Sequence, residues 1–243
     1  MNSSLKLAIA LAFIAPLAAQ AVPITTPINL IQNGSFESPA INNGTWTVVP
    51  GKNYLSADNT KNATKYMLNW DTDLTSGVEV RRNVAGVAQD GLNFIELDSH
   101  FGHFNSATFD NNTHGNSTNS WISQAVDTDA GHIYHLSYWF SPRGGVASAS
   151  NDINVYWNGS LLTTNTGSGI GQGGNVWQQF EFDVTGTGGW DTLKFAAGGT
   201  AQTYGGSLDN VSLVAAVPEP ETYALMMAGL GAVAFMARRR RPK

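Results

Sequence analysis

The 243-residue chain contains no cysteine. It therefore forms no disulfide, holds no metal ion through thiolates and has no cysteine nucleophile. Core packing, or a bound cation, must supply the stability of its folded part. The roughly 196 residues that remain when both ends are set aside are enough for a sizeable core without such cross-links.

Basic residues are scarce in the middle of the chain. Residues 22–217 hold 16 of the 18 acidic residues but only 7 of the 13 basic ones, which leaves a formal charge of −9 on this segment. A segment with this charge repels the phosphate backbone of a nucleic acid. We therefore expect no nucleic-acid partner.

Several catalytic signatures are also missing. The sequence has no glycine-rich phosphate loop, no Gly-x-Ser-x-Gly elbow and no His-Glu-x-x-His motif. Nucleotide chemistry, α/β-hydrolase catalysis and zinc-protease chemistry therefore have no support.

Long apolar runs occur only at the two ends. At the N-terminus, Lys6 precedes an apolar run from Leu7 to Ala19, and Ala19-Gln20-Ala21 is a small-x-small cleavage site. This pattern is typical of a secretory signal peptide, so we expect residues 1–21 to form an apolar signal helix that is removed after Ala21. The segment 22–216 then counts most simply as one domain.

The C-terminal residues 217–243 form a tail with three ordered features. The first is a Pro-Glu-Pro motif made by Val217, Pro218, Glu219 and Pro220. An uncharged apolar run of 15 residues follows from Tyr223 to Ala237, and the third feature is a cluster of four arginines, Arg238, Arg239, Arg240 and Arg241. The prolines stop a helix from entering the tail from the preceding domain.

The apolar run predicts a C-terminal membrane helix. At about 1.5 Å per residue it reaches about 22 Å, short of the ~30 Å hydrocarbon core of a bilayer, so the span would be thin. The arginines stay on the cytoplasmic side by the positive-inside rule, and the domain before the tail then lies outside.

The tail resembles the PEP-CTERM sorting signal of Gram-negative bacteria, with one mild departure at Glu221, where a small polar residue is usual. The resemblance implies that a membrane-embedded exosortase cuts near the motif. It also implies a secreted protein that is anchored transiently in the inner membrane and delivered to the cell envelope or the extracellular polysaccharide matrix. An ordinary C-terminal anchor is the alternative.

The segment between the two ends has the pattern of an all-β domain. From Ile133 to Phe140 apolar and polar residues alternate, and the same holds from Phe180 to Val184 and from Ile153 to Trp157. Asn158-Gly159 predicts a tight hairpin between Trp157 and Leu161. Further predicted strands are 29–36, 45–49, 78–82, 93–98, 121–126, 193–196 and 208–214. Ten short strands separated by turn residues suggest a jelly-roll β-sandwich.

Five short segments, in this order, resemble those of galactose-binding-like jelly-roll domains, which include many carbohydrate-binding modules. They are Asn29 to Glu37, Gly91 to Asp98, Ile122-Ser123-Gln124, Tyr134 to Tyr138 and Leu208 to Leu213. The resemblance implies a galactose-binding-like β-sandwich. It also implies a calcium ion near the first and last strands, held by Glu37, by Asp209 with Asn210 beside it, and by carbonyls of residues 33–35, since calcium takes six to eight hard oxygens. A hydrogen-bonded strand end without metal is the alternative.

A second set of polar residues lies on one strand. A period of two places Glu96, Asp98 and His100 on one face, opposite Ile95 and Leu97. Two carboxylates and an imidazole are the groups that glycoside cleavage uses. Residues two apart on a strand project side by side and do not face each other across a bond, so we expect an ordinary solvated strand face here.

Aromatic residues are the third set, since the apolar faces of sugar rings lie flat on indole and phenol rings. Most of them must fill the core. Trp139 and Tyr156 are the better candidates for carbohydrate binding, because they lie opposite Tyr138 and Trp157 on the polar phase of their strands. The sequence thus predicts a non-enzymatic, exported protein that binds extracellular polysaccharide. The alternatives are a polysaccharide hydrolase or lyase that uses Glu96 and Asp98, and a structural matrix protein without a specific ligand.

Overall fold

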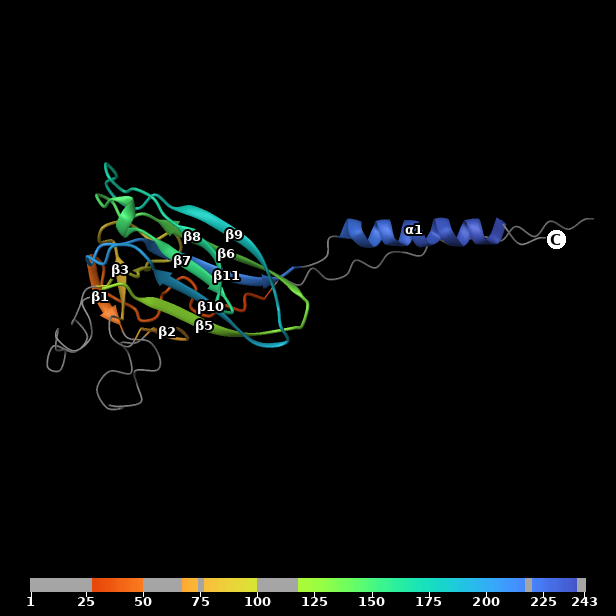
Figure 1. The fold of residues 1–243 in the computed structure, drawn as a ribbon, viewed down its shortest axis with the longest axis horizontal. Coiled ribbons are helices and arrows are strands. Elements are labelled where there is room, and N and C mark those ends of the chain that lie inside the picture. Colours follow the sequence, from red (N-terminus) through yellow and green to blue (C-terminus); the bar gives the residue numbers. More distant parts are fainter. Residues whose placement is uncertain (1–27, 50–66, 74–76, 100–117, 217–219, 240–243) are drawn as a thin grey trace, which may run out of the picture.

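The structure is a computed structural model, and it describes residues 28–49, 67–73, 77–99, 118–216 and 220–239 (Figure 1). The expected signal peptide, residues 1–21, lies outside the described residues. Eleven strands, one short 3-10 helix (η2, Ser148–Ser150) and the C-terminal helix α1 make up the described secondary structure.

The strands form two antiparallel sheets. The six-stranded sheet contains, in spatial order, β1 (Thr45–Val49), β3 (Val78–Arg82), β4 (Phe94–Glu96), β11 (Ser207–Ala215), β6 (Ile133–Ser141) and β9 (Gln178–Thr185). The five-stranded sheet contains β2 (Asp71–Thr72), β5 (Trp121–Thr128), β10 (Gly189–Ala197), β7 (Ile153–Trp157) and β8 (Ser160–Asn165). From β5 onward the chain crosses from one sheet to the other at every connection except the β7–β8 hairpin, and the predicted all-β jelly-roll sandwich is confirmed.

Several local predictions are also confirmed. The bounds of β1 and β3 are those that the sequence predicts, residues 45–49 and 78–82. The hairpin between β7 and β8 turns at Asn158 and Gly159, which have φ angles of +50° and +77°. Asparagine and glycine tolerate such angles, and a turn of this kind matches the twist of the two strands that it joins.

The predicted opening strand at residues 29–36 is wrong. Within it Asn29 forms an isolated bridge with Val214, and the chain then turns, with φ angles of +54° at Asn33 and +58° at Phe36. The Asn33 side chain holds this turn, because its amide donates to the Ser38 carbonyl at 2.7 Å and accepts from the Ser38 N–H at 3.0 Å. Local side-chain hydrogen bonding therefore overrides the strand pattern here.

Aromatic packing between the sheets forms the centre of the core. Tyr138 of β6 and Phe195 of β10 are both fully buried, and their rings meet edge to face with centroids 5.1 Å apart. Trp70 contacts Phe195 with centroids 6.4 Å apart and Phe36 with centroids 5.7 Å apart. The Tyr138 hydroxyl donates to Asn165 Oδ1 at 2.7 Å, so its polar end is satisfied inside the core.

Helix α1 (Pro220–Arg239) confirms the predicted tail helix and starts at a proline, which suits the first turn of a helix. Figure 1 shows it beyond the end of the sandwich, and its described apolar side chains, such as Met227 and Leu230, are exposed. The predicted membrane span is not supported. Among the helices that the structure describes, none is long and apolar enough to cross a bilayer.

Candidate functional site

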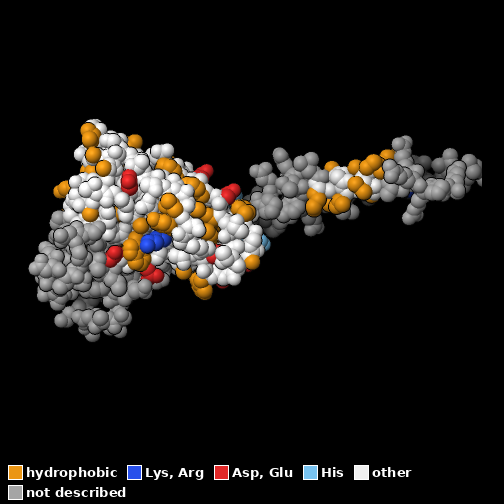
Figure 2. All heavy atoms as spheres, viewed as in Figure 1, with side chains coloured by type: hydrophobic (Ala, Val, Ile, Leu, Met, Phe, Trp, Pro, Cys, Tyr) orange, Lys and Arg blue, Asp and Glu red, His pale blue; other side chains and the backbone are white. Residues whose placement is uncertain are grey.

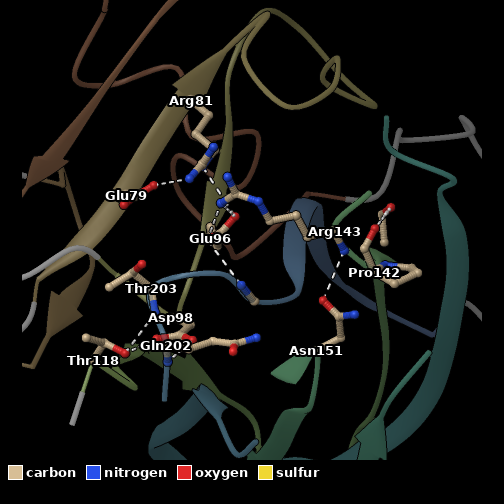
Figure 3. A network of polar contacts seen from close by, with 12 residues as sticks. Glu79, Arg81, Glu96, Asp98, Thr118, Pro142, Arg143, Asn151, Gln202 and Thr203 are labelled. Carbon is tan, nitrogen blue, oxygen red and sulfur yellow. Dashed lines mark hydrogen bonds and ion pairs between the residues drawn. The ribbon is translucent and has the colours of Figure 1, made fainter. Parts of the chain in front are cut away.

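The two acids considered for catalysis are buried, so the expected solvated face is wrong. Glu96 and Asp98, which Figure 3 draws as sticks, have no exposed surface. Glu96 pairs in register with Glu79 of β3 on one side and Ser207 of β11 on the other. A central strand covered by loops buries both of its faces, which strand periodicity cannot reveal. His100 lies outside the described residues.

Glu96 lies in a buried ion network (Figure 3). Arg143 Nη1 donates to both of its carboxylate oxygens at 2.8 Å, Arg81 Nε lies 3.4 Å from Oε2, and the Gly205 N–H donates to Oε1 at 3.1 Å. Burial raises the pKa of Glu96 to about 8, against the opposing effect of the two guanidinium groups. Arg81 also pairs with Glu79, so the network holds two carboxylates and two guanidinium groups.

Asp98 joins three segments of the chain. It accepts a hydrogen bond from the Thr118 hydroxyl and another from the Gln202 N–H at 3.0 Å. Its carboxylate therefore fixes the segment around residue 202 to the end of the β4 region. Both candidate acids are bound to protein partners that the structure describes.

Glu37 and Asp209 meet at one segment, residues 89–93. Asp209 Oδ2 accepts the N–H groups of Gln89 and Asp90 at 2.7 and 3.0 Å. Glu37 Oε1 accepts those of Leu92 and Asn93, both at 2.8 Å. Gly91 lies between, with φ +65°, and an added Cβ would stand 2.5 Å from Glu37 Oε1, so the close approach of this carboxylate requires glycine.

The oxygen chemistry around this segment fits a calcium ion. Asp209 is fully buried, and burial raises the pKa of its carboxyl to about 7 although three backbone N–H groups act to lower it. Asn93 Oδ1 is buried and accepts no hydrogen bond. Two carboxylates and an amide oxygen without a donor are ligands of the type that calcium prefers.

Two features limit the expected ligand set. The carbonyls of Asn33 and Gly34, expected as ligands, accept N–H groups of Trp70 and Val211 respectively. Across the described part of the chain, no group of three or more histidine, cysteine or acidic side chains gathers to hold a metal. Asn93 is the candidate ligand that sequence reasoning missed, because nothing in its strand pattern distinguishes it from other polar residues.

The aromatic residues divide between the core and the two outer faces. Trp70, Tyr138 and Trp157 are buried, as expected for most of the set. Trp139 and Tyr156 are half-buried and point outward, because their neighbours along each strand are buried. Trp139 belongs to β6 in the six-stranded sheet and Tyr156 to β7 in the five-stranded sheet. They therefore lie on opposite faces of the sandwich and cannot form one binding site.

The outer face of the six-stranded sheet carries a shallow groove of about 500 Å³ beyond Trp139. It is lined by His135, Leu136, Ser137, Glu181, Phe182, Asp183 and Val214. His135 Nδ1 lies 2.5 Å from Asp183 Oδ1, and both side chains are more than half exposed. The groove thus combines apolar side chains with two acids, and its imidazole is already paired.

The outer face of the five-stranded sheet is different in chemistry. Lys194 of β10 is the register partner of Tyr156, and its ammonium nitrogen lies 4.7 Å from the ring centroid of Trp121 on β5. Figure 2 shows basic atoms bordered by hydrophobic ones on the face where Figure 1 places β5, β10 and β7. Strand phase alone points Trp121 and Lys194 outward, but only the strand order places them beside Tyr156.

Comparison with known proteins gives two results. Residues 216–241 match the profile of the PEP-CTERM protein-sorting motif. No curated protein matches the chain. The C-terminus therefore carries a PEP-CTERM sorting motif, which implies an exported, envelope-associated protein.

Solved structures with a similar fold include carbohydrate-binding modules. A family 35 module from Paenibacillus barcinonensis is 18% identical, with 60% of this chain and 93% of that chain covered and a TM-score of 0.35. The family 61 module TmCBM61, solved with β-1,4-galactotriose, is 18% identical over 78% of this chain and 99% of that chain, with a TM-score of 0.42. The K1 adhesin domain of Lys-gingipain from Porphyromonas gingivalis is 14% identical over 62% and 92% of the two chains, with a TM-score of 0.44.

Replacing Glu96 with glutamine tests whether desolvation or ion pairing dominates in the buried network. Because the pKa of Glu96 is raised from 4.5 to about 8, the folded state holds this proton more tightly than the unfolded chain. Its contribution to stability is complete below about pH 4.5 and is lost as the pH rises to about 8. We expect the unfolding free energy of the wild type, measured by urea denaturation, to fall over this range relative to that of Glu96→Gln.

Asp209 titrates in both proteins, so its effect on the unfolding free energy cancels in the difference between them. If the ion pairs with Arg81 and Arg143 dominate instead, Glu96→Gln becomes the less stable protein as the pH rises, by about 3–5 kcal/mol at pH 8. That result would contradict the raised pKa.

Proposed function

We propose that this is an exported protein of a Gram-negative bacterium whose β-sandwich binds polysaccharide without catalysis. Exosortase recognises the motif from Val217 to Pro220 while the tail holds the chain at the inner membrane, and it cuts there. The protein is then delivered to the cell envelope or to the extracellular polysaccharide matrix. The PEP-CTERM match at residues 216–241 is the observation that carries the proposal.

Two further observations support the binding half of the proposal. Outward aromatic rings lie among polar side chains on each face of the sandwich, which suits the apolar faces and hydroxyls of sugars. Glu96 and Asp98 are buried and bound to protein partners, which speaks against the alternative of a hydrolase or lyase that uses them. A matrix protein without a ligand remains the other class, and self-assembly in the absence of sugar would favour it.

A calcium ion at Glu37, Asp209 and Asn93 is part of the proposal. When bound, it would supply positive charge to two carboxylates and would link the segments around residues 37, 89–93 and 209. In a domain without disulfides, this link would stabilise the sandwich and would take no part in any reaction.

Polysaccharide binding is tested with Trp139→Ala and Tyr156→Ala in affinity gels cast with exopolysaccharide of the host. Since the two residues lie on opposite faces, we expect one variant to bind roughly tenfold more weakly and the other to bind like the wild type. Thermal melting shows that each variant is folded. Wild-type protein that binds none of the host's polysaccharides would refute the binding half of the proposal.

Sorting is tested by the intact mass of the protein recovered from the matrix fraction of its host. We expect a species that lacks everything after the Pro-Glu-Pro motif. Alanine at Pro218, Glu219 and Pro220 should leave an unprocessed, membrane-retained form in which the sandwich is still folded. Matrix protein that retains Arg238 to Arg241 would leave the ordinary anchor as the explanation.

Calcium is tested by thermal melting with and without a chelator. A ligand that binds only the folded state stabilises it by ~2.7 kcal/mol at a hundredfold excess over Kd, so chelation should lower the melting temperature of the wild type. Because the pKa of Asp209 is raised to about 7, protons compete with the ion, and the calcium-dependent stabilisation should grow as the pH rises through 7.

Matched variants locate the calcium effect. Asp209→Ala should not respond to chelator, whereas Asp90→Ala, which removes an exposed acid from the same segment, should respond like the wild type. An unchanged wild-type melting curve in excess chelator would sink the calcium site and leave the rest of the proposal standing.

A further inference from the structure

We propose that the outer face of the five-stranded sheet is the polysaccharide-binding face, and that it selects mainly neutral chains that carry occasional anionic units. The inference rests on the proposed binding function and deepens it. The binding platform consists of Trp121, Lys194 and Tyr156, which we call the Trp-Lys-Tyr platform. Three observations support this face as the binding site and an anionic group in the ligand.

The first observation is the arrangement of the platform. Lys194 pairs in register with Tyr156 on one side and with Ser123 on the other, and Trp121 is two residues before Ser123 on the same strand. At the usual strand spacing and rise, the Cα atoms of Trp121 and Tyr156 lie about 12 Å apart. Two half-exposed rings at this separation span more than one sugar unit: Tyr156 offers a stacking surface at one end, and at the other the Lys194 ammonium lies over the ring of Trp121.

The second observation is the charge of Lys194. It is the single lysine among the residues that the structure describes, on a domain of formal charge −9. It forms no ion pair with any described residue, and its nearest described partner is the indole of Trp121. A lysine placed over an aromatic ring and between polar neighbours keeps its charge available for an anionic group of a ligand.

The third observation is the contrast with the opposite face. The groove beyond Trp139 contains Glu181 and Asp183, and its one basic group, His135, is already paired with Asp183. The face of the five-stranded sheet also carries acids, because Asp71 is the register partner of Ser123 and Asp127 that of Trp190. Unlike the groove, however, it presents a lysine that forms no ion pair with any described residue. Charge complementarity therefore assigns the anionic ligand to the five-stranded sheet.

The net negative charge of the domain limits how many anionic groups a bound polymer can carry. A polymer with a carboxylate on every unit is repelled by the net charge of the domain before it reaches Lys194. A mainly neutral chain escapes most of this repulsion and still supplies one anionic group to the lysine. Aromatic stacking then holds the neutral units on either side.

The experiment measures affinity for three forms of one polymer: polygalacturonate, the same polymer highly but incompletely methyl-esterified, and the fully esterified neutral form. At low salt we expect the wild type to bind the incompletely esterified form most tightly. Lys194→Gln should bind that form roughly tenfold more weakly, to the level of the neutral form, while Lys194→Arg keeps most of the affinity. Tyr156→Ala and Trp121→Ala should weaken binding to both forms.

Two control variants each replace an exposed or half-exposed tryptophan that lies outside the platform. Trp190, 75% exposed on the same sheet but opposite Asp127 at the far end of β10, and Trp139 on the opposite face should both tolerate alanine without change. A sulfated galactan distinguishes the anionic group: binding that Lys194→Gln weakens equally would assign sulfate as well as carboxylate to the platform.

The outcomes separate this inference from the proposed function. If the wild type binds these polymers or the host's polysaccharide, and Lys194→Gln or Tyr156→Ala binds equally well, the platform is overturned while carbohydrate binding stands. A loss of binding in Trp139→Ala alone would move the site to the opposite face. If the wild type binds none of the probes and none of the host's polysaccharides, the proposed function fails together with the platform.

Discussion

The packing of Tyr138 against Phe195 across the sandwich is the contact on which the rest of the structure depends. It joins β6 of one sheet to β10 of the other at full burial, in a chain that has no disulfide to hold its sheets together. Because side chains alternate along a strand, burying these residues turns Trp139 and Lys194 outward, away from each other. The core thus fixes the chemistry of both outer faces.

The buried charges follow from the same constraint. A closed sandwich covers Glu96 and Asp209 with loops, and burial raises the pKa of both carboxyl groups. Arg81 and Arg143 offset part of this cost at Glu96, whereas Asp209 has backbone N–H groups and no basic partner among the described residues. This difference in partners makes the first site a structural ion network and the second a candidate for a cation.

The domain and the tail differ in role. The tail carries the sorting motif, which consists of a short linear motif, an apolar helix and a run of arginines, and the described side chains of α1 are exposed. In the function that we propose, the sandwich supplies the surface that binds a polysaccharide after export. The proposed preference of that surface for an anionic group depends on Lys194, which lies over the ring of Trp121 and beside Tyr156.

The sequence by itself determined the features that depend on neighbours along the chain. The sorting motif, the helix after it, the strands at residues 45–49 and 78–82 and the Asn158-Gly159 hairpin all follow from local pattern and turn chemistry. Only the tertiary structure decided the rest. The order of the strands places Trp121 and Lys194 beside Tyr156 and puts Trp139 on the opposite face, and the loops that cover β4 bury Glu96. A period of two in the sequence predicts which face of a strand a residue occupies, but not which strand or loop lies against that face.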